Sequence, residues 1–142
     1  SFEGIPYATD DDDSQPEIGE IDKTKLGLLE TTGVSSHSIG NVLSNFKLWK
    51  LPTDNLKLVK GWFQDTVKPT SKQIKKIALL RLDGDLYEST KIPLQYLLSK
   101  VSKGGVVIID DWQLGGCKKA VLEFIDNTEI VEHLGIAYYV KK

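Results

Sequence analysis

The chain has 142 residues, of which 40% are hydrophobic and 27% charged, and its net charge at pH 7 is -2. This balance is typical of one soluble domain with a hydrophobic core. The sequence lacks the clustered basic and aromatic residues of a nucleic-acid surface, and it lacks the roughly 20-residue apolar run of a membrane span. The single cysteine, Cys117, excludes an internal disulfide and fits a reducing, cytoplasmic location.

The amino-terminal part of the chain is acidic. Residues 1–33 contain nine acids and two lysines, and the run Asp10–Asp13 lies within a stretch poor in apolar side chains. Such a composition is typical of a long solvated loop, and long loops in compact domains are often active-site lids. We therefore expect 6–33 to be an acidic lid loop, whose four aspartates form a mobile acidic surface or, alternatively, bind a cation. Because the chain starts at Ser1 and has no methionine, we expect it to be a segment or a processed product.

Two regular apolar patterns follow the lid loop. In 34–51 apolar residues recur at three- and four-residue spacing, which predicts an amphipathic helix that a serine caps and Pro52 ends. Residues 55–62 alternate between apolar and polar side chains, which predicts a strand that ends at Gly61.

Residues 77–82 are almost wholly apolar, which predicts a strand buried on both faces of a parallel sheet. The helical stripe that follows contains Pro93, and proline is tolerated in the first turn of a helix. We therefore expect Ser89 or Thr90 to cap this helix.

The remaining elements are separated by glycines. A glycine pair is expected to break the chain before a strand at 106–110, followed by a helix at 115–127 and by short strands at 129–135 and 136–142. The alternation of strands and helices predicts a doubly wound, Rossmann-like α/β sheet, in which ligands bind beyond the carboxyl ends of the strands.

Four acids lie at the ends of two of these strands: Asp83, Asp85, Asp110 and Asp111. Neighbouring strands are about 4.8 Å apart, so acids at their ends can converge. Carboxylates this close repel one another unless protons or a cation neutralise them, and Mg²⁺, before Ca²⁺, is the natural occupant. The alternative is that each aspartate is an ordinary cap or turn residue.

The segments that carry these acids resemble a known family. "LRLDGDLYEST" (80–90), "GGVVIIDDW" (104–112) and "GC" followed by "AVLEF" are similar to the macrocin O-methyltransferase (TylF-like) family, which methylates sugar hydroxyls with S-adenosylmethionine and Mg²⁺. "SFEGIP" (1–6) and "KGWFQDT" (60–66) look like two further blocks, so the resemblance covers most of the chain except the lid.

The resemblance implies a site. The metal ligands of the family fall on Asp83, Asp110 and Asp111, and its proposed general base falls on Asp85. The acceptor is expected to be a small molecule that contains a sugar, or a polysaccharide sugar. The family usually has tyrosine after the paired acids, whereas this chain has Trp112. This difference leaves the implied metal site intact, but the wall of the substrate pocket could differ from that of the family.

The resemblance also implies that 1–142 is the carboxy-terminal part of one class I methyltransferase domain, with 34–142 as lid helix and α/β core. No GxGxxG loop is present for the cofactor. Trp62, Phe63 and Asp65 look like the cofactor-adjacent block, with the rings near the adenine, although ordinary strand-end packing is the alternative. Strand 77–82 would have one unpaired side, which could associate with another copy of the chain.

Other interpretations of the residues exist. A haloacid-dehalogenase-type phosphohydrolase would use Asp83 as nucleophile and Asp85 as acid, but Tyr87 stands where that motif needs threonine or valine. A receiver domain also has paired acids after a strand, but near its beginning. A non-catalytic remnant that still binds a metal stays open.

Three further side chains are of residue types that often have functional roles. His37 is expected to be a solvated residue near a helix cap, with a substrate or proton-relay role as the alternative. Cys117 is expected to pack in the core. Arg81, inside an apolar strand, is expected to find a carboxylate in a salt bridge.

Overall fold

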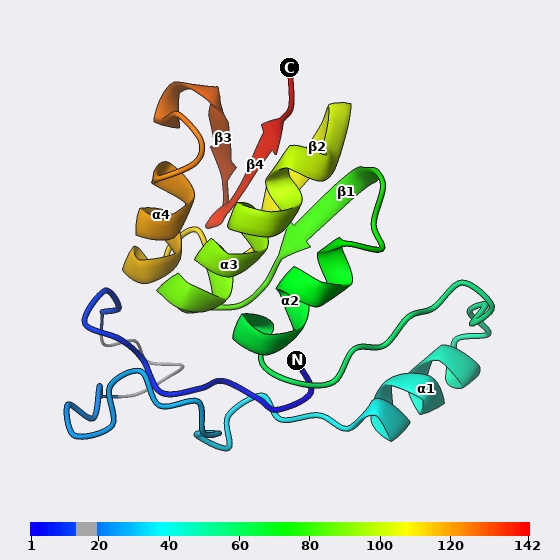
Figure 1. Cartoon of the computed structure of the whole chain (residues 1–142), viewed down its shortest axis with the longest axis horizontal. Helices are drawn as coiled ribbons and strands as arrows, with labels where there is room; N and C mark the ends of the chain where they lie inside the picture. The colour runs from blue at the N-terminus through cyan, green and yellow to red at the C-terminus, as the bar shows by residue number, and fades with distance from the viewer. Residues whose placement is uncertain (14–19) are drawn as a thin grey trace.

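The structure is a computed structural model that describes residues 1–13 and 20–142 (Figure 1). Residues 14–19 of the expected lid loop lie outside the described residues. The helices and strands follow the order α1 (Ile39–Leu48), α2 (Phe63–Ser71), β1 (Ile77–Leu82), α3 (Tyr87–Leu97), η1 (Leu98–Lys100), β2 (Val101–Ile109), α4 (Gly115–Leu122), η2 (Asn127–Glu129), β3 (Ile130–His133) and β4 (Ile136–Val140). None of the described helices is both long enough and apolar enough to cross a membrane.

The four strands form one open sheet in the order β1-β2-β4-β3. Strands β1 and β2 are parallel and joined through α3, whereas β4 runs antiparallel to both β2 and β3. Strand β1 lies at one edge of the sheet, as expected for 77–82. The mixed α/β fold confirms the expected architecture and brings the ends of β1 and β2 side by side.

Helices α2, α3 and α4 pack together on one face of the sheet (Figure 1). The core lies between this helical layer and the sheet, and its most completely buried side chains include Leu94, Val107, Ile109 and Val121. The opposite face leaves large apolar side chains exposed on β1, β3 and β4: Leu79, Val131, Ile136, Tyr138 and Val140. Burial of 77–82 on both faces is therefore not found among the described residues.

The expected strand at 55–62 is wrong. Leu56 and Leu58 are less exposed than their neighbours, as the alternation suggested, but residues 55–60 pair with no described strand. An extended segment needs a partner for its backbone groups before it becomes part of a sheet. Helix α2, which begins directly afterwards and contains Pro69, was not expected, because 63–76 was interpreted as a connection between strands.

Helix α3 begins at Tyr87, so neither Ser89 nor Thr90 is its cap, and Pro93 lies in its interior. The N-cap residue, Leu86, offers no side-chain hydrogen bond. The N–H of Tyr87 is instead bound by Asp12, which lies 75 residues earlier in the chain. A distant side chain therefore sets the start of this helix, and no local pattern could have revealed it.

Strand β2 is longer than expected and contains the glycine pair. Gly104 has a φ of +77° and donates its N–H to the carbonyl of Lys141, while Gly105 accepts the N–H of Lys141. The register with β1 shifts in this region. The glycines therefore form an irregularity inside the strand.

The last part of the chain is close to expectation. Helix α4 begins at Gly115 but ends at Leu122, earlier than 127. The two closing strands are confirmed as an antiparallel hairpin, β3 and β4. Its turn residues, Leu134 and Gly135, have φ values of +50° and +81°, which suits a two-residue turn with a left-handed backbone.

Candidate functional site

A pocket of about 360 Å³ opens beside the end of β1. Four segments far apart in the sequence contribute to its walls, with Ile5 and Pro6 from the amino terminus, His37 and Val42 around α1, Trp62–Gln64 at the start of α2, and Asp83–Asp85 with Ser89 after β1. Its volume is within the range of small-molecule sites. The edge that the sequence predicted as the ligand site therefore does carry a pocket.

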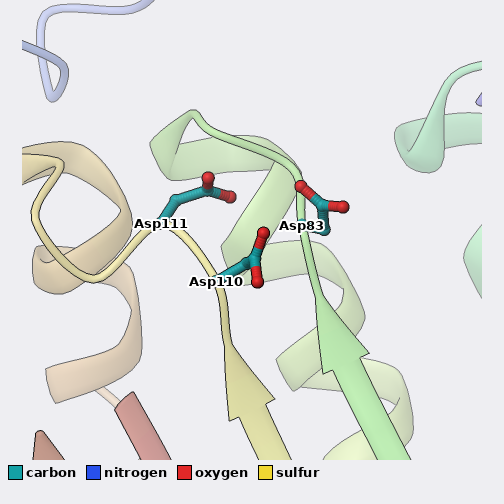
Figure 2. A group of neighbouring side chains, drawn as sticks. All are labelled: Asp83, Asp110 and Asp111. Atoms are coloured by element: carbon teal, nitrogen blue, oxygen red, sulfur yellow. The ribbon is translucent and has the colours of Figure 1, made fainter. Parts of the chain in front are cut away.

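Three of the four predicted acids come together at the strand ends. Asp83, Asp110 and Asp111 each offer a carboxylate oxygen, and these oxygens all lie within 4.8 Å of one another. Figure 2 shows Asp83 following β1 and the other two acids following β2. The N–H of Asp110 donates to the carbonyl of Leu82 at 2.9 Å, which continues the parallel pairing up to the cluster.

Asp111 is the buried member of the cluster, with 8% of its surface exposed. Its Oδ2 accepts the backbone N–H of Gly84 at 3.1 Å and that of Asp85 at 3.0 Å. Burial raises the pKa of this carboxyl, and the nearby carboxylates of Asp83 and Asp110 raise it further. An additional positive charge at the cluster would favour its ionised form.

Arg81 lies next to the cluster and is salt-bridged, as expected. Its guanidinium contacts Oδ2 of Asp83 at 2.5 Å and Oδ2 of Asp110 at 2.7 Å. Both partners are predicted metal ligands, so the arginine partly neutralises the cluster from the side.

Asp85 lines the pocket, whereas Asp110 and Asp111 are not among its lining residues. Its φ of +59° places it in the left-handed region, which non-glycine residues seldom adopt. The neighbouring Gly84 has little room for a side chain, because an added Cβ would lie 3.0 Å from the carbonyl oxygen of Ser89. The Asp83-Gly84-Asp85 turn therefore needs its glycine, and it separates Asp85 from the acid cluster.

The predicted cofactor residues are placed differently from one another. Trp62 and Phe63 line the pocket at the start of α2, together with Gln64. Asp65 is exposed in the first turn of this helix and is not a lining residue. Gly61, just before them, donates its N–H to the carbonyl of Ser1 at 3.0 Å, which ties this wall to the amino terminus.

Trp112 is buried and does not line the pocket. Its Nε1 donates to Glu132 of β3 at 2.7 Å, so it anchors the loop after the paired acids to the sheet. Cys117 is buried in the core, as expected, and burial raises the pKa of its thiol to about 12. His37 is exposed, as expected, and it also lines the pocket, so a substrate or proton-relay role stays an alternative.

One residue of the site was missed by sequence reasoning. Asp12, from the four-aspartate run, is 8% exposed and accepts the N–H of Tyr87 at 2.7 Å. This aspartate is therefore not part of a solvated acidic surface. The only local signal was Thr9, whose N–H and hydroxyl both donate to Oδ2 of Asp12.

With this geometry established, comparison with known proteins identifies the family. A family model described as macrocin-O-methyltransferase (TylF) matches residues 1–138. The chain belongs to this family. It is 37% identical over 126 residues to the 8-demethyl-8-(2,3-dimethoxy-alpha-L-rhamnosyl)-tetracenomycin-C 4'-O-methyltransferase of Streptomyces olivaceus, covering 87% of this chain and 44% of that protein. It is 38% identical over 135 residues to the demethyldecarbamoylnovobiocin O-methyltransferase of Streptomyces niveus, covering 94% of this chain and 48% of that protein.

Solved structures agree with this membership. The O-methyltransferase NovP is 33% identical, with a TM-score of 0.77, over 100% of this chain and 57% of that one. The calicheamicin methyltransferase CalS11 shares the fold at 21% identity, with a TM-score of 0.69 over 98% of this chain and 57% of that one. The chain of this macrocin O-methyltransferase family member thus spans about half the length of the curated relatives it matches.

Proposed function

We propose that the protein containing this chain transfers a methyl group from S-adenosylmethionine to a sugar hydroxyl in a Mg²⁺-dependent reaction. The observation that carries the proposal is the convergence of Asp83, Asp110 and Asp111 beside the pocket that contains Asp85. A relative from Micromonospora griseorubida, mycinamicin III 3''-O-methyltransferase, is 36% identical over 136 residues. We infer that the acceptor is the sugar of a glycosylated small molecule or of a polysaccharide.

The donor set of the acid cluster fits a hard divalent cation. It consists of carboxylate oxygens, which Mg²⁺ prefers. Arg81 engages Oδ2 of Asp83 and of Asp110, while the backbone N–H groups engage Oδ2 of Asp111. Each acid therefore retains an oxygen outside these hydrogen bonds. When bound, the cation would hold the acceptor oxygen and lower the pKa of its hydroxyl.

Asp85 is the residue that we assign as general base. It lies in the pocket wall, separated from the metal ligands by Gly84, and its carboxylate is an acceptor for the proton of the acceptor hydroxyl. Asp83 belongs both to the acid cluster and to the pocket wall, whereas Asp85 belongs to the pocket wall alone. The same short segment thereby supplies one metal ligand and the base.

Trp62 and Phe63 are the residues we assign to the cofactor. Their side chains line the pocket at the start of α2, where the rings can pack against an adenine. When bound, S-adenosylmethionine supplies an electrophilic methyl group. Asp65 stays a prediction, because it is exposed and is not among the residues that line the pocket.

Calorimetric titration with Mg²⁺ tests the metal site, and a methyl-transfer assay on the intact protein tests the reaction. We expect saturable Mg²⁺ binding that Asp110→Ala abolishes. In the assay we expect Asp85→Asn to keep metal binding while turnover falls by roughly 10² to 10⁴. Absence of Mg²⁺ binding would reject the metal site. Mg²⁺ binding without methyl transfer would favour a non-catalytic remnant.

A further inference from the structure

The backbone N–H groups of residues 84–87, in the turn between β1 and α3, are all hydrogen-bonded. Asp111 accepts those of Gly84 and Asp85, and Leu86 donates to the carbonyl of Gly84 at 2.6 Å. The N–H of Tyr87 donates to Oδ1 of Asp12. Two buried carboxylates, one from each end of the chain, therefore hold the turn that presents Asp85.

Asp12 is fixed by more than this one bond. Its Oδ2 accepts from the N–H and the hydroxyl of Thr9, at 2.9 and 3.0 Å. The neighbouring Asp11 forms a salt bridge with Lys119 of α4 at 2.5 Å. Residues 9–13, which we name the acidic latch, thus contact Tyr87 at the start of α3, where negative charge is favourable, and Lys119 in the last turn of α4.

The glycine pair at the start of α4 leaves room for the latch. A Cβ at Gly116 would overlap Oδ1 of Asp12, and a Cβ at Gly115 would overlap Oδ2 of Asp13. These two glycines have negative or extended φ and need no glycine for backbone reasons. The close approach of the acidic latch is what requires them.

We propose that Asp12 is a positioning residue for Asp85. Its carboxylate fixes the first N–H of α3, and so completes the support that keeps Asp85 in its left-handed conformation. The acidic latch follows Ile5 and Pro6, which line the pocket, closely in the sequence. Its contacts with α3 and α4 therefore fix the position of this pocket wall as well as that of Asp85. The catalytic part of this inference rests on the proposed function.

Amide hydrogen exchange on the intact protein tests the positioning directly. We expect Asp12→Ala to speed exchange at Gly84 and Asp85, which Asp111 holds, as well as at Tyr87, by about fivefold, the effect of losing a typical helix cap. A merely local role would change Tyr87 alone and would overturn the proposal. Asp10→Ala is the matched control, because Asp10 is an exposed member of the same run.

A second variant tests the proposal in case Asp12→Ala unfolds the protein. Gly116→Ala displaces the Asp12 carboxylate without altering it, and we expect the same pattern of faster exchange. Asp12→Asn keeps an oxygen for Tyr87 and should restore most of the protection at Gly84 and Asp85. Unchanged exchange at these two amides in Gly116→Ala, or no rescue by asparagine, would overturn the proposal.

Turnover adds a test of the coupling. We expect Asp12→Ala to lower kcat by roughly 10- to 100-fold. The double variant Asp12→Ala/Asp85→Asn should have the same kcat as Asp85→Asn alone. Additive losses would show that Asp12 acts independently of Asp85, which overturns the coupling. If the intact protein transfers no methyl group, the proposed function fails, whereas exchange at Gly84 and Asp85 still decides whether Asp12 positions the turn.

Discussion

The buried carboxylate of Asp111 accepts the backbone N–H of Asp85 at 3.0 Å. A predicted metal ligand is therefore also the structural support of the predicted base. The acid cluster and the pocket residue cannot vary independently, because a change in the position of Asp111 moves the turn that carries Asp85. This link gives the first prediction.

Replacement of Asp111 should separate its two roles. In Asp111→Asn the amide oxygen still accepts the N–H groups of Gly84 and Asp85, so we expect near-normal stability but weaker Mg²⁺ binding. In Asp111→Ala two partly buried donors lose a charged acceptor, which should lower the free energy of unfolding by about 1–3 kcal/mol. Urea unfolding with and without Mg²⁺ measures both effects. Equal destabilisation by the two variants would contradict the supporting role.

Arg81 should oppose binding of a cation. Its guanidinium partly neutralises Asp83 and Asp110. Without the guanidinium, the negative charges of both carboxylates would attract the metal ion more strongly. We expect Arg81→Met to tighten Mg²⁺ binding by roughly threefold to tenfold, the range for one partly screened charge nearby. Without Mg²⁺ the free energy of unfolding of this variant should fall by at most about 1 kcal/mol, because the two salt bridges of Arg81 are partly exposed to solvent.

Calorimetric titration measures this affinity, and Lys47→Met, which removes an exposed positive charge on α1, is the control. Weaker Mg²⁺ binding in Arg81→Met would mean that the arginine orients Asp83 and Asp110 for the metal and does not compete with it.

The thiol of Cys117 should be inert in the native state. Burial raises its pKa to about 12 from an ordinary value of 9.0. The native state then binds the proton more tightly than the unfolded state, so stability should fall as pH rises from about 9 towards about 12. Reaction with a thiol reagent at pH 8 should require unfolding, and Cys117→Ala should show a smaller loss of stability in that pH range. Rapid native labelling would contradict this burial.

The exposed face of the sheet should promote association. Leu79 on the edge strand β1 and Val140 on β4 are 58% and 45% exposed on the face opposite the helices. We expect the 142-residue chain to associate through this face or edge. Sedimentation velocity should show that Leu79→Lys reduces association, whereas Leu134→Lys, in the hairpin turn, should not. A monodisperse monomer at high concentration would reject this prediction.

Local sequence patterns were sufficient where short-range chemistry decides structure. Strand 77–82 was predicted with the bounds of β1, because a run of apolar residues between polar boundaries suits a strand beside a core. The closing hairpin followed from Gly135, and α1 followed from its helical spacing and from a serine cap, which the structure shows to be Ser38. The acids at the strand ends were predicted to converge because parallel neighbours end at the same edge.

The sequence by itself thus determined the four strands of the sheet, the family resemblance and the acid cluster, since each depends on residues close together in the chain or on strand pairing. Only the tertiary structure decided the start of α3, the role of the aspartate run and the burial of Trp112. In each case the deciding partner is remote: Asp12 binds a helix 75 residues away, and Trp112 bonds to Glu132 on another strand. A hydrogen bond between distant residues leaves no periodic signal, so only the packed chain reveals it.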